Sequence, residues 1–200
     1  MMNITYVLDG ALYLNITNKC PCACTFCIRK NGEGAYGSDC LWLEHQPSKE
    51  EVLAALAKED LGSFKEVVFC GFGEPTCELE ILKAAARYIR ENSNVKIRIN
   101  TNGLGDLING CGTASELKGL FDVVSISLNA SCREEYNRVT NPKWKDKSFG
   151  AMIAFAKAAK EIFPKVMLTV VDVISPDEIE KCRKLCDNLG ITLRVREYAE

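Results

Sequence analysis

Six short apolar and β-branched runs recur along the chain, and each except the last precedes a loop and a helical pattern. The runs cover residues 13–17, 66–70, 96–100, 123–128, 166–173 and 192–196. Apolar strands that alternate with helices are typical of a parallel sheet covered by helices. The repeat therefore predicts an α/β fold with parallel strands in the order (βα)5β.

Two of the expected helices have clear starting signals. Ser48 and Glu51 have the spacing of a capping box, as do Ser175 and Glu178, and Pro176 suits a first helical position. Apolar residues spaced three and four apart predict further helices near residues 78–91, 114–120 and 150–163. These helices fill most of the connections between the predicted strands.

The number of repeats limits the architecture. Six strands are too few for a closed eight-stranded barrel, so we favour a partial (βα)6 TIM-type barrel over a flat, doubly wound sheet. Periodicity alone does not separate these two folds, but both place the active site at the carboxyl ends of the strands. No linker-like stretch divides the sequence, so we expect a single domain over residues 1–200.

The loop after the first predicted strand carries Cys20, Cys24 and Cys27, a C-x3-C-x2-C spacing. Three thiolates from one loop can ligate three irons of a [4Fe-4S] cluster and leave the fourth iron open to a substrate or cofactor. The spacing therefore suggests catalysis more than electron storage.

Composition narrows the cellular setting and the partners. The chain has 11 cysteines, and an odd count without a leader-like N-terminus favours reduced thiols or metal ligands in a cytoplasmic protein. A net charge of -2 gives no basic surface that would imply nucleic acid. No apolar stretch approaches the roughly 18 residues of a membrane helix, so no membrane partner is expected.

Polar and glycine-rich segments follow successive predicted strands. Residues 71–75 read Gly-Phe-Gly-Glu-Pro, residues 100–103 read Asn-Thr-Asn-Gly, and the fourth strand carries Ser125, Ser127 and Asn129. Each segment alone is typical of an ordinary turn. Together, at the strand ends that follow a three-cysteine loop, they indicate a binding site for a ribose or amino-acid moiety.

These residues resemble the motifs of the radical SAM superfamily. The match comprises Cys20, Cys24 and Cys27, the aromatic Phe26, and Gly-Phe-Gly-Glu-Pro at 71–75 in place of the family's Gly-Gly-Glu-Pro. Residues 14–18, 68–71, 98–103, 125–130 and 194–198 resemble, more narrowly, the TatD-associated radical SAM proteins. The superfamily resemblance covers essentially the whole chain.

The resemblance implies two cofactors, a [4Fe-4S] cluster and S-adenosyl-L-methionine, and a role for each motif. Cys20, Cys24 and Cys27 would ligate the cluster, and the family spacing selects Cys20 over Cys22. The implied cofactor-binding residues are Phe26 and Val173 or Arg196 near the adenine, Gly71, Phe72, Gly73 and Glu74 near the methionyl amino group, and Asn102, Ser127 and Asn129 near the ribose or carboxylate.

The resemblance also implies a reaction and partners. Reductive cleavage of S-adenosylmethionine would give a 5′-deoxyadenosyl radical that abstracts hydrogen from an unknown small-molecule or peptide substrate. The implied partners are an electron donor such as flavodoxin or ferredoxin and a TatD-like hydrolase.

Several alternatives remain open. A 7-carboxy-7-deazaguanine synthase would have Thr or Ser where Ile28 follows the last cluster cysteine, and a glycyl-radical-enzyme activase would have Asp at Asn100. Outside enzymes, the cysteines suit an iron-sulfur electron carrier or a zinc-stabilised binding module. Arg194, Arg196 and Glu197 suit an anionic substrate group or a solvated ion pair. The glycine-rich loop 28–47 suits a lid or a flexible connection.

Overall fold

A seven-stranded sheet with strands in sequential order forms the centre of the molecule. The computed structural model describes residues 2–34 and 37–198. The strands are β1 Thr5–Leu8, β2 Ala11–Leu14, β3 Val67–Phe69, β4 Ile97–Thr101, β5 Val123–Ser127, β6 Lys165–Val171 and β7 Thr192–Arg196. From β2 to β7 each strand pairs in parallel with the next strand in sequence. This order confirms the partial TIM-type barrel, because a doubly wound sheet reverses its order at a switch point.

The N-terminal edge of the sheet differs from the prediction of parallel strands alone. β1 pairs antiparallel with β2, so the sheet gains a seventh strand that the sequence analysis missed. The turn between them holds Asp9 and Gly10, both at positive φ (49° and 73°). Asp-Gly is a favoured pair for tight hairpins of this kind, so the signal was present in the sequence.

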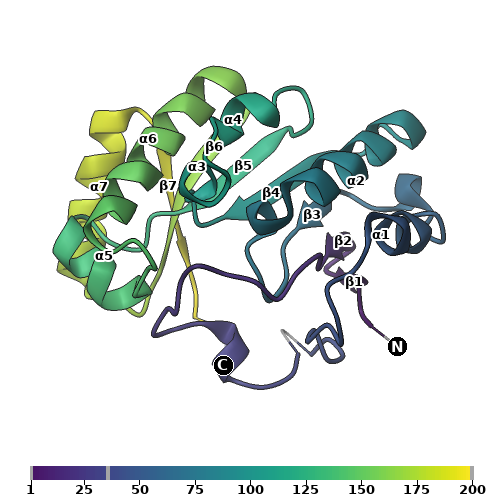
Figure 1. The fold of residues 1–200 in the computed structure, drawn as a ribbon. Helices are drawn as coiled ribbons and strands as arrows, with labels where there is room; N and C mark the ends of the chain where they lie inside the picture. The colour runs from purple at the N-terminus through teal and green to yellow at the C-terminus, as the bar shows by residue number, and fades with distance from the viewer. Residues whose placement is uncertain (1, 35–36, 199–200) are drawn as a thin grey trace.

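Seven α-helices connect the described strands, with three short 3-10 turns. The helices are α1 Lys49–Leu56, α2 Leu79–Asn92, α3 Gly105–Asn109, α4 Thr113–Glu116, α5 Arg133–Thr140, α6 Asp146–Ile162 and α7 Pro176–Leu189, and the turns are η1 Ile28–Lys30, η2 Leu61–Ser63 and η3 Pro75–Glu78. Figure 1 shows the α-helices gathered on one face of the sheet. None of the described helices is long and apolar enough to cross a membrane.

One of the two predicted capping boxes is complete. Ser48 Oγ accepts from Glu51 N at 3.1 Å, and Glu51 Oε2 accepts from Ser48 N at 2.8 Å. At the start of α7, Ser175 Oγ accepts from Glu178 N, but the Glu178 carboxylate accepts from Ser131 N at 2.8 Å instead. The second box is therefore half formed, and its glutamate ties α7 to the loop after β5.

The strands bury one face and leave the other polar. The buried set includes Leu12, Leu14, Val67, Phe69, Ile97, Ile99, Val124, Ile126, Leu168 and Val170, which pack under the helices in the main core. Cys182 and Cys186 of α7 join this core, as expected for hydrophobic positions. Alternate residues of β4 and β7, such as Arg98 and Arg194, face the other way. The inner face of the partial barrel is therefore available to polar ligands.

Candidate cofactor site

The cysteine-bearing loop lies across the carboxyl end of the sheet and is held by the end of α5. Ala23 N donates to Thr140 O at 3.0 Å, and Thr25 N donates to Val139 O at 2.9 Å. The helix stops because Asn141 adopts a left-handed conformation with φ of 39°. The sequence analysis missed α5, although Glu134 in its first turn is a typical helix-start signal.

Among the four cysteines of this loop, the Cys22 thiol contacts the thiols of Cys20 and Cys24. Cys22 is buried, while Cys20, Cys24 and Cys27 are partly exposed. Hydrogen bonding with the Cys22 thiol lowers the pKa of Cys20 and the pKa of Cys24, and the same contacts raise the pKa of Cys22. The assignment of Cys20, Cys24 and Cys27 as ligands stays a prediction.

The arrangement of possible metal ligands differs between a site for a single ion and a site for a cluster. Among residues 2–34 and 37–198, no group of three or more His, Cys, Asp or Glu side chains is arranged around one metal ion. A cubane cluster asks for a different arrangement, because each cysteine binds a separate iron. The Asn102 side-chain amide lies 4.0 Å from Cys20 Sγ and 3.9 Å from Cys22 Sγ, so a weak donor already faces these sulfurs.

The glycine loop after β3 packs directly on the cysteine loop. A Cβ at Gly73 would lie 2.1 Å from the Thr17 carbonyl oxygen and 2.8 Å from that of Lys19. Glu74 N donates to Lys19 O at 2.8 Å. At Gly71 a Cβ would lie 2.1 Å from Asn15 Oδ1. Both glycines are therefore required by close contact with the segment that leads to the cysteines.

Replacing Gly73 by alanine is expected to separate these two loops. The added methyl group meets backbone oxygens, which cannot rotate away, so we expect a loss of about 1–3 kcal/mol in the free energy of unfolding. Urea unfolding under reducing, anaerobic conditions measures this loss. The matched control is Gly150→Ala on α6, where nothing lies within 4 Å and alanine should stabilise the helix by about 0.5–1 kcal/mol. Equal midpoints for the two variants would contradict the close contact at Gly73.

Glu74 joins the loops that follow β3 and β4. Its Oε1 accepts from Thr76 N (3.1 Å), Thr76 Oγ1 (2.8 Å) and Thr101 Oγ1 (2.7 Å), and its Oε2 accepts from Asn102 N at 2.7 Å. Burial raises the pKa of Glu74, and these hydrogen bonds oppose the shift in part. Both carboxylate oxygens are occupied by protein donors. Glu74 therefore positions the backbone of its own loop and that of Asn102.

The structure brings the other predicted residues to the same end of the sheet. Ser127 ends β5, and Asn129 follows it in a left-handed conformation with φ of 61°. Val173 is exposed in the turn after β6, and Arg196 ends β7. Phe26 packs against the main core from the cysteine loop. Their roles in cofactor binding stay predictions.

Phe72 has a different local role from its glycine neighbours. Its side chain is buried against Leu41, and its ring meets Trp42 edge to face with centroids 5.0 Å apart. The Arg29 guanidinium lies 5.6 Å from the centre of the Trp42 ring. Phe72 therefore packs the segment around Leu41 and Trp42 against the glycine loop.

Polar residues in the segment that leads to the cysteines also hold the loop predicted as a lid or a flexible connection. Asn15 Nδ2 donates to Leu41 O at 2.6 Å, and Asn18 Nδ2 donates to Leu43 O at 2.8 Å. The sequence analysis did not assign either asparagine a role. Their position in the segment that leads from the strand to the cysteines could have indicated a role near the site. The part of the loop near residues 41–46 is thus anchored beside the site.

Comparison with known proteins identifies the class to which this fold and site belong. The family model of the radical SAM superfamily matches residues 14–186, so the chain belongs to that superfamily. Its members use a [4Fe-4S] cluster and S-adenosylmethionine. A comparison with curated protein sequences found no match.

Solved structures share the fold at low sequence identity. SuiB of Streptococcus suis bound to S-adenosylmethionine is 20% identical, with a TM-score of 0.67 over 94% of this chain and 38% of its own. A radical SAM methyltransferase from Sphaerobacter thermophilus is 18% identical, with a TM-score of 0.66 over 96% of this chain and 57% of its own. Native anSMEcpe with bound AdoMet is 21% identical, with a TM-score of 0.66 over 94% and 51%. The chain thus spans between 38% and 57% of these proteins' lengths.

Proposed function

We propose that this protein is a radical SAM enzyme that cleaves S-adenosylmethionine reductively at a [4Fe-4S] cluster and abstracts hydrogen from a substrate. The observation that carries the proposal is the backbone contact between two loops at the carboxyl end of the sheet. Gly73 and Glu74 pack on Thr17 and Lys19, directly before Cys20. This contact supports a role for residues 71–74 as an amino-group receptor next to the proposed iron ligands.

In this proposal each loop performs a separate task. Cys20, Cys24 and Cys27 hold three irons, and the Asn102 amide donates toward the Cys20 sulfur, a contact of the kind that tunes a cluster's potential. The backbone of residues 71–74 receives the methionyl amino group. When bound, the cluster and S-adenosylmethionine supply reductive C5′–S cleavage and a 5′-deoxyadenosyl radical that removes hydrogen from a substrate.

Residues at the other strand ends orient the cofactor in the same proposal. Ser127 and Asn129 bind the ribose or carboxylate, and Phe26, Val173 and Arg196 lie near the adenine. These roles are supported by the position of the residues at one end of the sheet. They lie at or after the ends of β5, β6 and β7 and on the cysteine loop.

Anaerobic reconstitution with iron and sulfide tests the proposed chemistry. We expect about four irons per chain and release of 5′-deoxyadenosine when dithionite and S-adenosylmethionine are added. Iron analysis and chromatography of the nucleoside products measure both. Stoichiometric zinc without cleavage would support a zinc-stabilised module, and four irons without cleavage would support an electron carrier.

The proposal extends to a setting and partners. We place the enzyme in the cytoplasm, with flavodoxin or ferredoxin as reductant, since its many thiols suit a reducing compartment. The link to a TatD-like hydrolase is supported by the sequence resemblance at residues 14–18, 98–103 and 194–198. Co-purification of the tagged protein with such a hydrolase would test it.

A further inference from the structure

A cavity of about 300 Å³ opens on the inner face of the partial barrel, toward the starts of the strands and beside Arg194, the third residue of β7. It lies at the end of the sheet opposite to the cysteine loop. Side chains from β2, β4, β6 and β7 and from the segment before β3 line it, and those used below are Tyr13, Glu66, Arg98, Lys165 and Arg194. The antiparallel β1–β2 hairpin forms one wall through Leu8 and Asp9.

Cationic groups dominate this cavity. Four cationic side chains line it against two carboxylates, although the whole chain has a net charge of -2. Arg98 and Glu66 neutralise each other, because the guanidinium contacts both carboxylate oxygens at 2.9 and 3.2 Å. The side chains of Lys165 and Arg194 are exposed and form no hydrogen bond or ion pair with any residue that the structure describes. Their charges are therefore available to a ligand.

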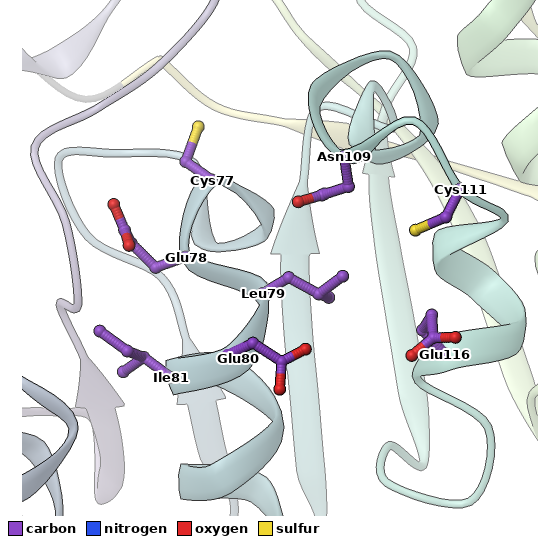
Figure 2. Close-up of a pocket in the computed structure, with 8 residues that line it drawn as sticks. All are labelled: Cys77, Glu78, Leu79, Glu80, Ile81, Asn109, Cys111 and Glu116. Carbon is purple, nitrogen blue, oxygen red and sulfur yellow. The ribbon is translucent and has the colours of Figure 1, made fainter.

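A second hollow, outside the barrel near the start of α2, has an acidic lining. It has a volume of about 430 Å³, and its charged lining residues are Glu78, Glu80 and Glu116. Figure 2 shows these carboxylates with Cys77 and Cys111, on the helix side of the sheet around the start of α2. The cationic excess thus belongs to the inner face and is not a general property of the hollows in this protein.

The distance between the two ends of the sheet determines how long a ligand must be to reach from this cavity to the cofactor site. β6 rises about 20 Å from Lys165 at its start to Val171 at its end, whereas Arg194 lies midway along β7. A substrate held at the strand starts by an anionic group would therefore have to be extended to present a hydrogen atom at the carboxyl ends. The hydroxyl groups of Ser125 and Ser127 lie on the inward-facing positions of β5, between these two ends.

We propose that this cavity binds the anionic group, carboxylate or phosphate, of an elongated substrate through Arg194 and Lys165. Hydrogen abstraction from the opposite end of the substrate rests on the proposed function, but anion binding in this cavity does not. The paired Arg98 and Glu66 form a fixed, neutral floor, with the Tyr13 hydroxyl group beside it. An elongated acidic molecule matches both the charge and the spacing.

Calorimetric titration of the reconstituted protein with pyrophosphate and, separately, with citrate tests the site and distinguishes phosphate from carboxylate recognition. We expect at least one probe to bind with a single site, and Arg194→Ala and Lys165→Ala each to weaken it by roughly 10-fold to 100-fold. Arg194→Lys should restore part of the loss. Arg183→Ala, an exposed residue of α7, should leave the affinity unchanged.

Two results would overturn the proposal. The first is no saturable binding of either probe to the unmodified protein, and the second is equal affinity in the Arg183, Arg194 and Lys165 variants. Cleavage of S-adenosylmethionine without substrate should proceed at the same rate in Arg183→Ala as in the unmodified protein. Failure of cleavage in both, with anion binding intact, would reject the proposed function and leave the anion site standing.

Discussion

Replacing Cys20, Cys24 or Cys27 by alanine, one at a time, is expected to reduce iron from about four atoms per chain to background after reconstitution. Each thiolate would hold a different iron, so no neighbour can replace the lost ligand at the same corner. Release of 5′-deoxyadenosine should fall to the level measured without protein. Iron analysis, the visible absorption of the cluster and nucleoside chromatography measure these effects.

Cys22→Ala is the matched control, because Cys22 lies in the same loop and its thiol contacts those of Cys20 and Cys24. We expect it to retain about four irons and most of the cleavage activity. A Cys22 variant that loses iron as completely as the Cys20 variant would contradict the ligand assignment. The C-x3-C-x2-C spacing would then have selected the wrong cysteine.

Replacing Glu74 by alanine is expected to lower the free energy of unfolding by about 2–4 kcal/mol. The change leaves the buried backbone N–H groups of Thr76 and Asn102 without acceptors. Glu74→Gln should cost about 1–3 kcal/mol, because its single amide oxygen can face only one of these two N–H groups. Urea unfolding under reducing conditions measures both losses.

The same substitutions should affect the cofactor site. Without Glu74 the loop after β3 is no longer joined to Asn102, so we expect a higher KM for S-adenosylmethionine at unchanged iron content. Glu91→Gln, an exposed position on α2, serves as the control and should change stability by less than about 0.5 kcal/mol. Equal stability of the Glu74 and Glu91 variants would show that the buried hydrogen bonds contribute little.

Much of the fold could be predicted because its signals are local. The apolar runs locate six parallel strands, although β2 ends at Leu14 rather than at residue 17. The capping box at Ser48 needs only residues within one turn, and it forms as predicted. At Ser175 the local signal competes with a distant partner, since the Glu178 carboxylate binds Ser131 N. The prediction therefore failed where a residue far along the chain offered an alternative donor.

The candidate site also has some features that the sequence predicted and others that it did not. The cysteine spacing and the Gly-Phe-Gly-Glu-Pro segment were visible as motifs, and the structure brings them together at the strand ends. The sequence analysis predicted that the backbone of residues 71–74 lies near the methionyl amino group, which stays a prediction, but it did not foresee the four hydrogen bonds that the Glu74 side chain accepts within the protein. The support of the cysteine loop by α5 was also missed, because it depends on hydrogen bonds between residues more than 100 positions apart.

The sequence by itself determined the six parallel strands, the resemblance to the superfamily and the residues proposed to hold the cluster, since each of these depends on a pattern within a short segment. Only the tertiary structure decided that Gly73 must lack a side chain, that Glu74 joins two loops, and that Arg194 and Lys165 face one cavity. The physical reason is that close packing and charge pairing are set by neighbours in space. Those neighbours come from strands and loops far apart along the chain.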